Sequence, residues 1–379
     1  MTLFVFFILA VYSGMHAYLF LRARSVFGFG PTVGSALAAC MLLMVFSIFL
    51  IRTLELYDYE SAARALSYIA YFWMAAAFLV FSGSLFLDFV GFITRVVGGV
   101  LRSDVSAFLI PRHLGFFICL GLSAAICAYG YFEARDIRTE RIRIETEKLP
   151  KGTDRLVIAQ ISDVHLGLII RDERLGKMLD IVKAAKPDIF ISTGDLVDAQ
   201  INHLVGLAEQ LRGIKTTYGN YAITGNHEYF AGVMKALAFT RDAGFTIIRN
   251  EAMSVGPITI AGVDDRTAIQ LGLGKAVSEH ELLAKLPRDR FILFLKHQPR
   301  IDPATIGLFD LQLSGHTHKG QIFPFNLLTL FVFPRNAGSF DLGQGSLLYV
   351  SRGTGTWGPP IRFLAPPEVT IIELVRKGR

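Results

Sequence analysis

Residues 156–165 read Leu-Val-Ile-Ala-Gln-Ile-Ser-Asp-Val-His, an apolar run that ends in an aspartate and a histidine. A short apolar run of this kind is typical of a buried strand in an α/β sheet. Leu175, Met178, Leu179 and Val182 follow it at helical spacing. A strand followed by a helix predicts an α/β domain in this part of the chain.

The same pattern recurs along the following 150 or so residues. Four more apolar runs are each followed directly by polar residues that can bind metal: 188–192 by Thr-Gly-Asp, 221–224 by Gly-Asn-His-Glu, 291–295 by Lys-His-Gln-Pro, and 311–313 by Ser-Gly-His-Thr-His. In α/β sheets a site is built in the crevice beyond the strand ends. We therefore expect these motifs to meet in one site.

Each cluster alone is a weak signal, but their combination and order are specific. The chain contains, in this order, Asp163-x-His165, Gly194-Asp195, Gly225-Asn226-His227-Glu228, His297 and Gly315-His316-x-His318. This order resembles the signature of the calcineurin-like metallophosphoesterase superfamily over roughly residues 156–350. The resemblance implies an α/β domain with two mixed β-sheets in a sandwich flanked by helices.

The resemblance also implies a centre with two divalent metal ions. One ion would be held by Asp163, His165, Asp195 and His318, and the other by Asp195, Asn226, His297 and His316, so that Asp195 bridges them. Two such ions about 3.5–4 Å apart can clamp a phosphate, and a hydroxide between them is a nucleophile near neutral pH. No cysteine follows Cys127. The nitrogen and oxygen donors suit Mn²⁺, Fe or Zn²⁺ and do not choose among them.

Three side chains outside the metal set are candidates for contact with the substrate. By the resemblance, the catalytic residues are His227, which lies beside the phosphate and donates a proton or hydrogen bond, and Asp198, which orients it. A solvated turn residue is the alternative for Asp198. Arg352 follows the β-like run 347–350 and is a candidate for bidentate phosphate contact, with an ordinary surface arginine as the alternative.

Departures from other branches of the superfamily restrict the activity. Ser/Thr protein phosphatases continue the Gly-Asp-x-x-Asp motif with Arg-Gly and lack the terminal Gly-His-x-His, whereas this chain has Ala199-Gln200 and both histidines. The chain is more similar to the membrane-anchored bacterial-type branch. That branch includes phosphodiesterases and enzymes that cleave the pyrophosphate of UDP-2,3-diacylglucosamine.

The first third of the chain has a different composition. The 379 residues are 52% hydrophobic and 18% charged, and residues 1–134 contain seven arginines, six acidic residues and no lysine. Four apolar stretches are long enough to span a hydrocarbon core of about 30 Å: 3–21, 33–51, 66–93 and 114–132. We expect a transmembrane domain at 1–134, a charged connector at 135–151 and a metallophosphoesterase domain at 152–379.

Basic residues near the span ends predict the orientation. The first and third loops carry five arginines, whereas the second loop and the connector carry seven basic residues. This balance predicts a multi-pass membrane protein with a cytoplasmic catalytic domain. Asp88 lies inside the third stretch, where a carboxylate is a functional candidate; a residue near the headgroups is the alternative.

Two apolar segments beside the motifs bear on the substrate. Residues 322–334 are consistent with a buried strand pair or with a loop that dips into the bilayer surface, and Leu166, Leu168, Ile169 and Ile170 would form the opposite lip. Two apolar lips would suit a lipid-linked phosphoester, with membrane lipid as a partner, and a small-molecule phosphoester is the alternative substrate. The net charge is +6, but no basic stretch interleaved with aromatics follows residue 155, so we expect no nucleic-acid partner.

The sequence therefore predicts a membrane-anchored phosphoesterase that uses two metal ions to hydrolyse a phosphodiester or pyrophosphate bond. The alternative is a membrane transporter or sensor whose soluble domain binds metal or nucleotide. Sparse charge within the spans disfavours transport. The complete ligand set disfavours a soluble domain that has lost its activity.

Overall fold

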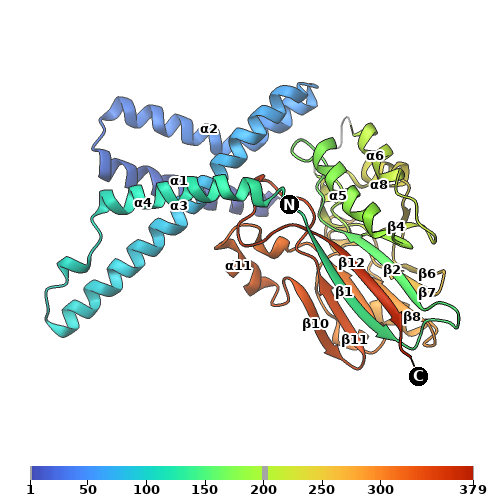
Figure 1. Cartoon of the computed structure of the whole chain (residues 1–379). Helices are drawn as coiled ribbons and strands as arrows, with labels where there is room; N and C mark the ends of the chain where they lie inside the picture. Colours follow the sequence, from blue (N-terminus) through green and yellow to red (C-terminus); the bar gives the residue numbers. More distant parts are fainter. Residues whose placement is uncertain (1, 199–203, 379) are drawn as a thin grey trace. The chain divides into compact units, whose positions relative to one another are not determined.

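The computed structural model describes residues 2–198 and 204–378 (Figure 1). The chain divides into two compact units: Met1–Tyr131 with Gly358–Ile361, and Phe132–Trp357 with Arg362–Arg379. The first unit is helical and the second combines sheets and helices. The predicted fold class, apolar helices followed by an α/β domain, is confirmed.

The helical unit is built from long apolar helices. They are α1 (Thr2–Phe27), α2 (Pro31–Leu56), α3 (Glu60–Leu101) and most of α4 (Arg112–Glu133), with a 3-10 turn η1 (Ser106–Phe108) before α4. Four helical segments of the described chain are long and apolar enough to cross a membrane. With 42 residues, α3 is about 63 Å long at 1.5 Å per residue, roughly twice the hydrocarbon thickness. It therefore extends well beyond its expected apolar stretch, 66–93.

The second unit contains two six-stranded sheets. The first has the order β1 (Arg138–Thr146), β12 (Glu368–Arg376), β2 (Arg155–Ile161), β3 (Ile189–Ser192), β4 (Asn220–Ala222), β5 (Thr246–Ile247). The second has the order β10 (Gly338–Gly343), β11 (Ser346–Val350), β9 (Leu311–Ser314), β8 (Phe291–Leu295), β7 (Ile258–Gly262), β6 (Glu251–Val255). Both sheets are mixed, because β12 runs antiparallel to β2, and β10 and β6 run antiparallel to their neighbours.

Apolar side chains of both sheets meet in one core. Ile158 and Ile191 from the first sheet pack in one cluster with Ile260, Leu293 and Leu313 from the second, and all five are fully buried. Helices α5 (Asp172–Ala185), α6 (Val205–Arg212) and α8 (Val233–Asp242) lie along the first sheet (Figure 1). Because the central strands are covered on both faces, they are apolar throughout rather than alternating.

Short elements complete the unit. They are α7 (Asn226–Phe230), α9 (Thr267–Gln270), α10 (Glu279–Ala284), α11 (Phe325–Val332), η2 (Pro303–Thr305) and η3 (His318–Gly320). The expected strands before the five motifs all exist, and β8 has the predicted bounds. No more than two residues separate the end of each of these strands from its motif, which places the candidate ligands on loops at the strand ends.

The predicted connector differs from the structure. Residues 138–146 form β1, which pairs in parallel with β12 from Arg138↔Glu368 to Thr146↔Arg376. The sequence Arg-Ile-Arg-Ile at 141–144 alternates between polar and apolar residues, and Ile142 and Ile144 pack against the core. Such alternation is typical of a strand with one buried face. The α/β unit therefore begins before the predicted connector ends.

Candidate active site

Several predicted ligands lie on strained backbone. Asp163, His165, Asp195, His316 and His318 have φ values of 54°, 54°, 51°, 72° and 47°. A side chain in this left-handed region costs about 1–2 kcal/mol, and such conformations persist where the surroundings fix them. The amide of Asp163 donates to Gly194 O at 3.0 Å and that of His165 to Asp195 O at 3.0 Å. These hydrogen bonds lock the first two ligand loops together.

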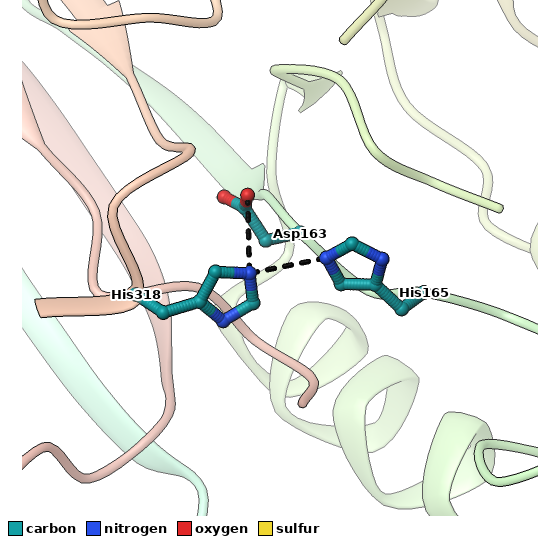
Figure 2. Close-up of side chains that lie close together, drawn as sticks. All are labelled: Asp163, His165 and His318. Carbon is teal, nitrogen blue, oxygen red and sulfur yellow. Dashed lines mark hydrogen bonds and ion pairs between the residues drawn. The ribbon is translucent and has the colours of Figure 1, made fainter. Parts of the chain in front are cut away.

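The first ligand cluster consists of Asp163, His165 and His318 (Figure 2). Nε2 of His165 lies 3.1 Å from Nε2 of His318, which in turn lies 3.4 Å from Oδ1 of Asp163. Figure 2 shows Asp163 and His165 on one loop and His318 reaching them from another. All three are buried. Three donor atoms therefore point into one small volume that is closed to solvent.

The second cluster consists of Asp195, His297 and His316. Nε2 of His297 lies 3.2 Å from Oδ2 of Asp195 and 3.2 Å from Nδ1 of His316. Oδ1 of Asn226 lies 2.9 Å from Nδ1 of His316. Asp195 also forms a group with His165, whose Nε2 is 3.9 Å from Oδ2 of Asp195. Asp195 thus faces ligand atoms of both clusters.

Glycines permit the loops to approach this closely. Gly194 has φ +95°, and a Cβ there would lie 2.6 Å from Gly225 N and 2.8 Å from His297 Nδ1. A Cβ at Gly315 would overlap Ser162 Oγ and the carboxylate of Asp163. The glycine of each motif is therefore required because another loop packs against its backbone.

Two neighbouring groups hold the ligands in place. Nδ1 of His297 donates to Thr193 O at 2.8 Å, which fixes the ring so that Nε2 faces Asp195. The carboxylate of Glu228 accepts the backbone N–H groups of Asp195 at 3.0 Å and Gly225 at 2.6 Å. The sequence motif contains Glu228, but no role followed from it, because three of its four backbone partners, Asp195, Leu196 and Val197, belong to another loop.

The charges of the site fit bound cations. Burial raises the pKa of Asp163 to about 6. The pKa of His297 is lowered by burial, but Asp195 outweighs this effect and raises it well above its usual value. Among the predicted metal ligands, only a proton on His297 balances the negative charge of the two buried carboxylates, Asp163 and Asp195, and this balance is poor. Divalent ions held by these nitrogen and oxygen donors would supply the missing charge.

Comparisons with known proteins identify this constellation. The sequence model of the calcineurin-like phosphoesterases matches residues 156–320. An uncharacterized metallophosphoesterase of Aquifex aeolicus is 40% identical over 260 residues, which cover 68% of this chain and 99% of that protein. The chain belongs to the calcineurin-like metallophosphoesterase family. It is therefore a hydrolase of phosphoester bonds that uses divalent metal ions, as predicted.

Two other relatives are similar to large parts of the chain. A metallophosphoesterase of Campylobacter jejuni, also uncharacterized, is 32% identical over 307 residues, 80% of each chain. A Danio rerio protein named transmembrane protein with metallophosphoesterase domain is 30% identical over 270 residues, 68% of this chain and 62% of that one. Together with the four apolar helices, these relatives support association of this metallophosphoesterase with a membrane.

His227 and Asp198 form a pair beside the ligand clusters of the metallophosphoesterase. Nδ1 of His227 lies 2.9 Å from Oδ1 of Asp198, and the His227 ring lies 4.5 Å from the ring of His165. Burial lowers the pKa of His227, but Asp195 and Asp198 outweigh burial and raise it to about 9. Both carboxylates therefore favour the protonated form of the ring. The proton-donor role of His227 and the orienting role of Asp198 stay predictions.

Arg352 does not lie among the ligands of the metallophosphoesterase. Its Nε lies 2.7 Å from Oε2 of Glu368, and its Nη2 pairs with Glu140. Both carboxylates come from strands of the first sheet, so the phosphate contact expected of Arg352 finds no support. Arg362 takes the place near the site instead: it is fully buried, and its Nη2 lies 3.0 Å from Nδ1 of His318. No pattern in the sequence predicts that Arg362 is buried.

The apolar segment after the last ligand motif of the metallophosphoesterase is a helix. In α11 no residue is buried, and Phe331 and Leu327 are 86% and 59% exposed. The expectation of a buried strand pair is therefore wrong. The helix leads to Phe333, whose ring lies 5.2 Å from that of His316. An exposed apolar surface thus adjoins a candidate metal ligand.

The expectation that residues 166–170 form a second apolar lip is also wrong. Leu166, Ile169 and Ile170 are buried, because residues 166, 170 and 197 pair through isolated β-bridges that turn these side chains inward. Phe230 and Trp357 are about half exposed instead, and their rings lie 5.5 and 6.3 Å from the ring of His227. The exposed apolar groups near the site are therefore aromatic.

Proposed function

We propose that this metallophosphoesterase uses two divalent ions to hydrolyse a phosphodiester or pyrophosphate bond of a lipid-linked substrate. The observation that carries the lipid linkage is the exposed apolar helix α11, which follows the His316 and His318 ligands by only a few residues. A surface of this kind is costly in water and is favourable at a bilayer interface.

The ligand clusters suggest how the ions would be held. Asp163, His165 and His318 would hold one ion, and Asn226, His297 and His316 the other, with Asp195 shared. Bound divalent ions polarise the phosphoryl oxygens and lower the pKa of a coordinated water. The choice among Mn²⁺, Fe and Zn²⁺ is left open by these donors.

The chain's own residues would act on the leaving group. In hydrolysis, water supplies a hydroxyl to phosphorus, the bond from phosphorus to the leaving oxygen breaks, and that oxygen gains a proton. Protonated His227 would donate this proton, and Asp198 would orient the ring; the 2.9 Å contact between Nδ1 of His227 and Oδ1 of Asp198 supports this pairing. Glu228 and Thr193 keep the ligand loops fixed, so that little reorganisation is needed during the reaction.

The site also offers room for a polar part of the substrate. A cleft of about 340 Å³ opens beside His297, and Arg266, Lys275 and Arg300 lie along it. The guanidinium of Arg300 stacks 4.8 Å from the centre of the Phe333 ring. A substrate with its phosphate at the ligands could place a polar group in this cleft and its acyl chains toward α11.

The test compares two substrates of the same bond type with purified full-length enzyme loaded with Mn²⁺. One is a soluble phosphodiester, and the other is the same diester carrying long acyl chains in mixed micelles. We expect the double variant Leu327→Ser/Phe331→Ser to lose at least about tenfold in kcat/KM on the lipid substrate alone. Met234→Ser, which removes an equally exposed apolar side chain from α8, is the matched control.

Three results would count against the proposal. Equal losses on both substrates would place the effect of α11 on the fold or on the chemistry rather than on the lipid. A large loss for Met234→Ser would show that any exposed apolar residue matters. Absence of turnover on both substrates with Mn²⁺, Fe²⁺ and Zn²⁺ would contradict a phosphodiesterase.

We also propose that the four helices cross the membrane and that the catalytic unit is cytoplasmic. Seven basic residues in the second loop and residues 135–148, against five in the other two loops, support this orientation. A reporter phosphatase that is active only outside the cytoplasm, fused after residue 150, should be inactive. An active fusion would reverse the orientation without touching the proposed chemistry.

A further inference from the structure

The helical unit contains a cavity lined by three arginines. The cavity measures about 390 Å³ and is bounded by α1, α3, α4 and the segment between α3 and α4. Arg22, Arg95 and Arg112 line it together with Asp88. The guanidinium groups come from three different helices, and the metallophosphoesterase chemistry uses none of them. One carboxylate against three guanidinium groups leaves the cavity with a net charge of +2.

Asp88 is committed to one of the three arginines. Its Oδ1 lies 2.7 Å from Nη1 of Arg22, and Tyr18 donates its hydroxyl to Oδ2 at 2.5 Å. Nε of Arg22 is buried and has no hydrogen-bond partner within residues 2–198 and 204–378. In the same described part of the chain, neither Arg95 nor Arg112 forms a close ion pair with a carboxylate. Among the described residues, Arg95 therefore has no carboxylate within ion-pair distance, and Arg112 interacts with Asp88 only from beyond that distance.

The rest of the lining is apolar or small. Leu21, Leu87 and Ile110 supply apolar walls, and a Cβ at Gly91 would contact Nη1 of Arg95 at 3.4 Å. Arg95 and Arg112 are exposed, so an anion can reach both guanidinium groups beside these apolar walls. An occupant with both an anionic and an apolar part would satisfy the whole cavity.

We infer that this cavity binds the phosphate group of an anionic phospholipid, with the guanidinium groups on the phosphate and the acyl chains against the apolar walls. Guanidinium groups match phosphate oxygens through paired hydrogen bonds. Basic pockets between membrane helices are a known type of lipid headgroup site. A free phosphate offers the same anionic chemistry, but it would leave Leu21, Leu87 and Ile110 without a partner. The inference does not depend on the substrate of the catalytic site.

The test measures lipid retained by purified full-length protein, using native mass spectrometry of protein from micelles that contain phosphatidylglycerol or phosphatidylcholine. We expect preferential retention of phosphatidylglycerol and at least a tenfold weaker preference in Arg95→Gln/Arg112→Gln. The matched control is Arg24→Gln/Arg102→Gln, which removes the same charge near the ends of α1 and α3 but does not touch the cavity lining.

A volume variant provides a second, independent measurement. Gly91→Leu should fill the cavity while all three guanidinium groups remain, and we expect it to lose phosphatidylglycerol retention as the charge variant does. Size-exclusion chromatography and the melting temperature report whether each variant folds. If the double variant misfolds, the single variant Arg95→Gln is tested in its place, because the Arg95 side chain is exposed.

Each other result overturns the inference. Equal retention of both lipids by the unaltered protein excludes a headgroup site. An equal loss in Arg24→Gln/Arg102→Gln shows general attraction of basic helix ends to anionic lipid. Complete displacement of the lipid by millimolar inorganic phosphate assigns the cavity to a soluble anion instead.

Discussion

Replacing Asp198 by Asn tests whether this residue acts through His227. The carboxylate of Asp198 lies 2.9 Å from Nδ1 of His227, and its side chain is 27% exposed. Asn retains the size of the side chain but removes the negative charge. The variant therefore loses a charge-assisted hydrogen bond to the protonated ring while the nearby backbone stays the same.

Asp198→Asn and His227→Asn should lower kcat by different amounts. A hydrogen bond to a charged group is worth about 1.5–3 kcal/mol, or about 10- to 150-fold in rate. Because Asp198 is partly open to solvent, we expect the lower end, about a tenfold fall in kcat for Asp198→Asn. Loss of a general acid costs about 10²–10⁴-fold, and we expect this for His227→Asn. KM should change little in both, because neither residue is among the predicted metal ligands.

The assay is a double-mutant cycle on metal-loaded enzyme with the soluble phosphodiester. If Asp198 acts only by orienting His227, the double variant should be no slower than His227→Asn alone. Asp180→Asn, on the exposed face of α5, controls for loss of one acidic side chain. If the kcat loss of the double variant equals the product of the two single losses, Asp198 does not act through His227. Unchanged turnover in His227→Asn would remove this residue from the reaction.

Three further changes test the support of the site. Glu228→Gln should lower the free energy of unfolding by about 2–4 kcal/mol. The reason is that an amide nitrogen would face two of the four backbone N–H groups that donate to the carboxylate. Urea unfolding measures this loss, and a loss below about 0.5 kcal/mol would contradict the prediction. Gly315→Ala should release bound metal, measured by elemental analysis, because its Cβ would overlap Ser162, whereas Gly206→Ala on α6 has open space and should retain metal. Chelation of the metal should abolish turnover and lower the melting temperature, because metal binds the folded state alone. Added Mn²⁺ should restore both. An unchanged melting temperature would argue against tight metal binding.

The ligand positions could be predicted because their signals are local. Each apolar run marks a buried strand, and the polar residues directly after it sit where strand ends meet. The runs before Asp163, His297 and Gly315 became β2, β8 and β9 in this way. The close packing of the motif loops is visible in the sequence only as glycines, and their need appears once the loops face one another.

Features that depend on distant partners could not be predicted. The strand β1 exists because β12, more than 200 residues later, supplies its hydrogen-bond partner. The run after His165 has the same composition as an exposed lip, but a β-bridge between residues 166 and 197 buries it. Composition also could not separate an exposed apolar helix from a buried strand pair at α11, since both need the same residues.

The positions of Arg352 and Arg362 explain why the site depends on bound cations. Arg352 is neutralised by Glu140 and Glu368, and Arg362 is fully buried, where it donates to the carbonyl oxygens of Gly355 and Ala365. Neither guanidinium is placed to meet a phosphate. The positive charge that such a substrate requires would then come from the bound ions, from His227, and from Arg266, Lys275 and Arg300 of the cleft beside His297. On this reasoning the metals are needed for substrate binding as well as for the hydrolytic step.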